Sequence, residues 1–131
     1  MAAHPSEPRR DAERALRVGD AGEMASAVTR SHLADSRCVG WFGPVPPGWV
    51  VAIDAEISTA PVPASLGRRF GGDRFWERWT RAECLCKLAG VPMPAWLREH
   101  GLDVPADNSC AWRTVRVDDL VISVAFAKGG G

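Results

Sequence analysis

This sequence of 131 residues contains no apolar run that approaches the roughly 20 residues a membrane-spanning helix requires. Its first residues, MAAHPSEPRRDAER, also lack the apolar core of a secretion signal. The formal net charge is zero, so no overall electrostatic attraction favours nucleic acid or a membrane surface. These absences predict a cytoplasmic protein that binds neither, with a disordered stretch over residues 1–10 and a flexible glycine tail over residues 129–131.

Metal-binding cysteine spacings are missing as well. Cys38, Cys84, Cys86 and Cys110 do not form the paired motifs of a zinc site. Cys84 and Cys86 are two residues apart, so on a helix they would point to separate faces. In a reducing compartment such cysteines remain thiols. We therefore expect four reduced cysteines in or near the core.

The composition is that of one globular domain, without internal repeats or low-complexity segments. Hydrophobic residues make up 46% of the chain and charged residues 24%, which is ordinary for a folded protein. The length allows a substantial core but is small for a two-lobed enzyme. We assign residues 11–128 to this single domain.

The first half of the chain alternates between helical and extended patterns. Small and apolar residues recur at helical spacing over residues 11–29, and Gly19 and Gly22 leave open whether this is one helix or two short ones. A strand is expected at residues 38–42. The turn after it is rich in Pro and Gly, which predicts a hairpin with a second strand at residues 49–57.

The middle of the chain indicates a loop followed by helices. Residues 60–72 contain several Pro and Gly residues and predict an irregular loop. Asp73 is a plausible N-cap for a helix over residues 74–88, which Gly90 would end. A short helix is expected at residues 94–100.

The chain closes with a predicted hairpin of strands at residues 111–117 and 120–127. Together these elements predict an α+β fold in which a long helix packs across an antiparallel sheet.

Three carboxylates and one lysine form the most informative pattern. Over residues 49–57 apolar side chains alternate with Asp54 and Glu56, so a strand would project both carboxylates on one side. Glu83 and Lys87 are four residues apart and would share one helix face. Such carboxylates can bind a hard cation such as Mg2+, which takes its remaining ligands from water or a phosphate. The alternative is a strand with one face in water and an ordinary Glu–Lys surface pair.

The strand and the helix that carry these residues read VAIDAE over residues 51–56 and WTRAECLCK over residues 79–87. In this order they resemble the 4'-phosphopantetheinyl transferase superfamily, whose motifs are hydrophobic-Gly-hydrophobic-Asp-x-Glu and Trp-x-x-Lys-Glu-Ala-x-x-Lys. The upstream pair Ser31-His32 and the closing hairpin are also similar to that family, so the resemblance covers residues 30–127. The functional motif positions fall on Asp54, Glu56, Glu83 and Lys87.

The resemblance implies a 4'-phosphopantetheinyl transferase-like fold and a Mg2+-dependent reaction. The 4'-phosphopantetheine arm of coenzyme A would pass to a serine of an apo acyl or peptidyl carrier protein. The resemblance assigns the metal to Asp54, Glu56 and Glu83. Glu83 would act as the base and Lys87 would bind a phosphate oxygen. Coenzyme A would be bound by Ser31, His32 and Lys87, with His32 at its 3'-phosphate.

Several positions depart from the family motifs. Ala82 stands where the family usually has Lys, Ala52 where it has Gly and Cys84 where it has Ala, and the connection over residues 58–73 is short. These departures motivate an alternative, a binding or scaffold protein without transfer activity, or an enzyme repurposed for another ligand. Surfactin-type members hold the cofactor between two similar halves. We therefore expect this shorter chain to self-associate, most simply as a dimer.

Arginines are concentrated in one part of the sequence. Five of them fall within fourteen positions that contain only two carboxylates, Asp73 and Glu77; they are Arg68, Arg69, Arg74, Arg78 and Arg81. Such a cluster could meet an acidic partner, and acyl carrier proteins are acidic. A solvated helix face explains the cluster equally well.

Overall fold

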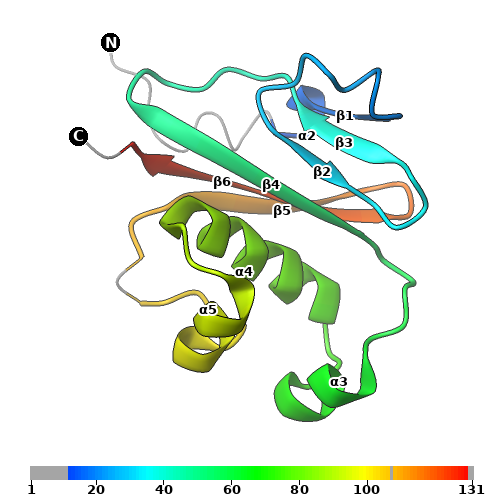
Figure 1. Ribbon diagram of the computed structural model, residues 1–131, viewed down its shortest axis with the longest axis vertical. Coiled ribbons are helices and arrows are strands. Elements are labelled where there is room, and N and C mark those ends of the chain that lie inside the picture. Colours follow the sequence, from blue (N-terminus) through cyan, green and yellow to red (C-terminus); the bar gives the residue numbers. More distant parts are fainter. Residues whose placement is uncertain (1–11, 107, 130–131) are drawn as a thin grey trace.

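The computed structural model describes residues 12–106 and 108–129 (Figure 1). In chain order the elements are α2 (Ala12–Ala15), β1 (Leu16–Gly19), β2 (Arg30–His32), β3 (Cys38–Trp41), β4 (Trp49–Ile57), α3 (Ala64–Phe70), α4 (Phe75–Ala89), α5 (Met93–His100), β5 (Ala111–Val117) and β6 (Leu120–Lys128). None of these helices has the length and apolar character needed to cross a membrane. The predicted disordered stretch over residues 1–10 lies outside the described residues, as do residues 130–131 of the predicted tail.

The strands form two antiparallel sheets, and helices α3, α4 and α5 form a third layer. The larger sheet has the order β4-β6-β5 and the smaller one the order β1-β3-β2. Figure 1 shows the smaller sheet on one side of the larger sheet, with α3, α4 and α5 on the other. The predicted α+β class, with a long helix across an antiparallel sheet, is therefore confirmed.

The middle strand β6 explains why the larger sheet has a core on each face. Its residues from Leu120 to Phe126 are all buried, as expected for a strand covered on both sides. One core lies between the two sheets and includes Trp41 and Ile53. The other lies between the larger sheet and the helices and includes Ala52 and Leu85. Neighbouring residues of β4 therefore face opposite cores, which puts Asp54 on the helix side.

The helix predicted over residues 11–29 is wrong. Among residues 12–29 only α2 is helical; β1 follows it directly and pairs with β3, with Leu16 opposite Trp41. After β1 the chain turns over residues 21–26. Two glycines weaken the helical pattern, and hydrogen bonds to a strand distant in sequence replace it.

The predicted hairpin between residues 38–42 and 49–57 is also wrong. Both strands form, but β3 pairs with β1 and β2, while β4 pairs with β6. The Pro-rich turn between them carries the chain from one sheet to the other. The closing hairpin of β5 and β6 is confirmed, with Val117 opposite Leu120.

The helices differ in detail from their predicted limits. Helix α3 forms within the stretch predicted as an irregular loop. Arg74, rather than Asp73, is the N-cap of α4, in a left-handed backbone conformation with φ of 49°. The end of α4 is as predicted, because Gly90 adopts φ of 69°, which glycine reaches without steric strain.

Candidate functional site

The two motif segments meet where α4 crosses β4. The Nζ atom of Lys87 lies 3.0 Å from the carbonyl oxygen of Ile53 and 3.4 Å from Oδ1 of Asp54. The side chain of Lys87 remains 42% exposed, whereas that of Asp54 is only 11% exposed. A buried carboxylate and a partly exposed ammonium group therefore lie side by side at the edge of the helix layer.

Ser31 approaches the same carboxylate from the smaller sheet. Its hydroxyl lies 3.4 Å from Oδ1 of Asp54 and accepts a hydrogen bond of 3.3 Å from the backbone N–H of Ala55. Ser31 is buried, so this contact joins β2 to β4 away from water. The sequence identified Ser31 as a candidate for cofactor binding, but its contact with Asp54 could not be seen from the motif.

His32 follows Ser31 and is exposed on β2. Successive residues of a strand point to opposite sides, so the two side chains diverge. Among residues 12–106 and 108–129, none forms a hydrogen bond with the imidazole. His32 is therefore next to Ser31 in the chain, but its side chain points away from Asp54. Its part in coenzyme A binding stays a prediction.

Electrostatic interactions link the three carboxylates. Burial raises the pKa of Asp54 to about 7; Lys87 opposes this rise, while Glu83 and Glu56 add to it. Burial also raises the pKa of Glu56, again with a contribution from Glu83. Burial and mutual repulsion destabilise the ionised carboxylates here, so a bound cation would stabilise them.

The fit of a cation to this site depends on which carboxylate oxygens lack a protein partner. Oδ2 of Asp54 is buried and has no hydrogen-bond partner within the described residues, so a cation could bind it without displacing a protein contact. No set of three or more His, Cys, Asp or Glu side chains in the described chain is already gathered closely enough to hold a metal ion. Asp54 fits Mg2+ as a ligand, and at least one of Glu56 and Glu83 would have to move before all three carboxylates could bind the ion.

A row of hydroxyl groups continues from Asp54 beneath α4. Ser123 of β6 is the register partner of Asp54, and Thr114 of β5 is the register partner of Ser123. The Ser123 hydroxyl lies 2.8 Å from the hydroxyls of both Thr114 and Thr80. The sequence prediction missed this row. Alternation within a strand could have indicated that Thr114 and Ser123 are polar positions among apolar ones, but not that they lie side by side.

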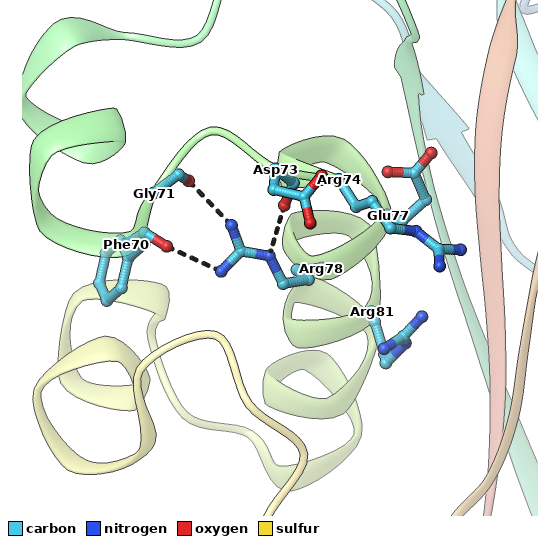
Figure 2. Close-up of a pocket in the computed structure, with 7 residues that line it drawn as sticks. All are labelled: Phe70, Gly71, Asp73, Arg74, Glu77, Arg78 and Arg81. Atoms are coloured by element: carbon cyan, nitrogen blue, oxygen red, sulfur yellow. Dashed lines mark hydrogen bonds between the residues drawn. The ribbon is translucent and has the colours of Figure 1, made fainter.

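The arginine cluster divides in the structure. Arg74, Arg78 and Arg81 line a cavity of about 500 Å3 at the start of α4 (Figure 2). A second cavity of about 480 Å3 shares Arg74 and Arg81 and reaches β5, where Arg113 and Arg116 join its lining. We call the two adjoining cavities the arginine groove. Arg69 does not line the groove; its guanidinium lies over the Phe70 ring and donates to the carbonyl of Leu97.

All four cysteines are free thiols. Cys38, Cys84 and Cys86 are buried, and Cys110 is half-buried. The expected placement in or near the core is confirmed. Burial raises the pKa of Cys84 and Cys86, which keeps both protonated and unreactive.

Comparison with protein-family models, with curated proteins and with solved structures finds no match to this chain.

Proposed function

We propose that this protein transfers the 4'-phosphopantetheine group of coenzyme A to a serine of an apo acyl or peptidyl carrier protein, in a Mg2+-dependent reaction on a 4'-phosphopantetheinyl transferase-like fold. One observation supports the proposal most. Lys87 and Ser31 both lie 3.4 Å from Oδ1 of Asp54, although the three positions are distant in the sequence. All three belong to the motifs that carry the family resemblance.

In this proposal Asp54, Glu56 and Glu83 would hold Mg2+. When bound, the metal supplies positive charge that stabilises the pyrophosphate of coenzyme A as its bond breaks. Oδ2 of Asp54 is buried and has no hydrogen-bond partner in the described part of the chain, which supports a metal here, and so does the raised pKa of the same carboxyl group.

The other steps belong to the protein side chains. Glu83 would take the proton of the carrier serine, whose oxygen attacks the phosphorus atom next to the pantetheine arm. The bond to the departing adenosine 3',5'-bisphosphate then breaks. Lys87 would donate to a phosphate oxygen, and its partial exposure leaves the ammonium group within reach of a ligand. Ser31 would hold Asp54 in position, and His32 would meet the 3'-phosphate of coenzyme A.

The test is to incubate the protein with coenzyme A, Mg2+ and a panel of apo carrier proteins, and to measure the intact mass of each carrier. We expect a gain of one phosphopantetheine group, abolished by EDTA. Glu83→Gln should lower the rate at least about 100-fold, because it removes the base. Glu99→Gln, an exposed carboxylate on α5, is the matched control and should retain the rate.

The second candidate is a binding or scaffold protein without transfer activity, or an enzyme repurposed for another ligand. It is favoured by the absence, within the described residues, of a gathered three-residue metal site. Ala82, at the position of the usual family lysine, is also buried and supplies no charge. If no carrier gains mass and calorimetry detects no coenzyme A binding, the transferase proposal is wrong and this candidate replaces it.

A further inference from the structure

The arginine groove carries more positive charge than its neighbours neutralise. It contains two carboxylates, Asp73 and Glu77, against the five arginines that line it; these are Arg74, Arg78, Arg81, Arg113 and Arg116. A surface of this charge excludes cations and attracts anions. Which of the arginines are available depends on the contacts each one already makes.

Three of the five are paired with carbonyl or carboxylate oxygens of the protein. Arg78 donates from its guanidinium to the carbonyl oxygens of Phe70, Gly71 and Asp73, as Figure 2 shows. Arg116 forms an ion pair with the buried Glu77. The partner of Arg113 is Glu13, at 3.8 Å. These arginines maintain the walls of the groove.

Arg74 and Arg81 remain for a ligand. Figure 2 shows their guanidinium groups on the Glu77 side of α4, away from that of Arg78. No residue among 12–106 and 108–129 accepts a hydrogen bond from the guanidinium of Arg74. Nε of Arg81 is buried and has no hydrogen-bond partner among the described residues. Another guanidinium nitrogen, Nη2, donates a long hydrogen bond of 3.4 Å to the Thr114 hydroxyl.

Trp112 helps to position Arg81. The guanidinium carbon of Arg81 lies 4.0 Å from the centre of the Trp112 ring, a cation–π contact. Burial, together with repulsion from Arg74, lowers the pKa of Arg81. An oxyanion between the two arginines would satisfy the buried Nε and would screen the repulsion.

We propose that the arginine groove binds a small phosphate-bearing molecule, with Arg74 and Arg81 donating to its phosphate oxygens. Planar guanidinium groups match the oxygens of a phosphate in pairs, and two of them suit a ligand with more than one charged group. The cavity volumes, about 500 and 480 Å3, lie in the range of small-molecule sites. This site is independent of the transferase proposal, because neither arginine belongs to the Asp54 site.

Inorganic pyrophosphate is the probe that tests the proposal. Calorimetry on the full chain in EDTA, without Mg2+, should detect saturable binding. Arg74→Gln and Arg81→Gln should each weaken it at least about tenfold, the loss expected for a hydrogen bond to a charged group. In NMR spectra of the wild type, the Nε–H signal of Arg81 should shift on titration with pyrophosphate.

Two control variants locate the bound anion. Arg98→Gln removes an equal charge from an exposed position on α5 and should change the affinity less than about twofold. Lys87→Met, which alters the Asp54 site, should also leave it unchanged. Because Arg74 is exposed, Arg74→Gln should fold normally, and its melting curve checks this.

The proposal is overturned if the wild type does not bind pyrophosphate, or if Lys87→Met abolishes binding while the groove variants retain it. Equal weakening in Arg98→Gln would also overturn it, because the attraction would then be non-specific. If a polyglutamate peptide binds the groove and pyrophosphate does not, the groove is instead a docking site for an acidic protein.

Discussion

At the residue scale, burial of Asp54 costs free energy in the folded protein. Asp54 is only 8% exposed, so its carboxylate loses most of its hydration, and Oδ2 has no hydrogen-bond partner within the described residues. A strand of otherwise apolar residues would be more stable with an apolar side chain at this position. A group retained at such cost is typical of a functional site.

The raised pKa of Asp54 predicts a specific pH dependence of stability. Between its ordinary value of 3.8 and about 7, the folded protein holds a proton that the unfolded chain has lost. The free energy of unfolding should therefore fall as the pH rises through this window. Between pH 5 and pH 8 the free energy of unfolding should decrease by roughly 2 kcal/mol less in Asp54→Asn than in the wild type, as measured by urea denaturation in EDTA.

Asp103→Asn is the control for this measurement, since Asp103 is exposed outside the site. That variant should retain the pH dependence of the wild type. An unchanged slope in Asp54→Asn would mean that the carboxylate stays ionised through the whole window, and the assignment of the dependence to Asp54 would be wrong.

At the element scale, α4 organises both sites. Its C-terminal half brings Lys87 to Asp54, and its N-terminal half brings Arg74 and Arg81 to the arginine groove. The helix starts without a side-chain cap. The connection before it is held instead by Arg78, whose three backbone contacts span the end of α3 and the residues that follow.

Arg78→Gln should therefore destabilise the α3–α4 connection. A glutamine cannot reach all three carbonyl oxygens, so we expect the free energy of unfolding to fall by about 1–3 kcal/mol in urea denaturation. Arg98→Gln, which removes the same charge from a residue exposed on α5, should change stability by less than about 0.5 kcal/mol. Equal stability of the two variants would show that solvent replaces the contacts of Arg78 without cost.

At the scale of the whole molecule, contacts between residues distant in sequence join the smaller sheet to the larger one. Ser31 contacts Asp54 in the interior, and at the surface the guanidinium of Arg37 donates twice to the carboxylate of Asp119, at 2.8 Å each. The candidate site therefore depends on both sheets, since its carboxylate lies on one and a partner of that carboxylate on the other.

The dimer predicted from the motif resemblance also belongs to this scale. A second copy would complete a coenzyme A cleft that the family builds from two halves. We expect light scattering over a dilution series to give twice the monomer mass at working concentration. A monomer mass throughout the series would contradict the prediction and leave the site to a single chain.

The sequence indicated much of the candidate site but not its geometry. Asp54, Glu83 and Lys87 were identified from spacing on one strand and one helix, and the structure brings Lys87 to Asp54. The Ser31 contact and the partners of the groove arginines could not be predicted, because they depend on how separate elements pack. Burial of Asp54, which causes its raised pKa, is likewise a property of packed layers.

The sequence by itself determined the elements whose signals are local. Helix α4 with its glycine end and the closing hairpin depend on periodicity, turn residues and neighbours a few positions apart. Only the tertiary structure decided that Leu16–Gly19 is a strand and that β3 and β4 belong to different sheets. Those outcomes rest on hydrogen bonds and burial between residues far apart in the chain, which outweigh weak local preferences.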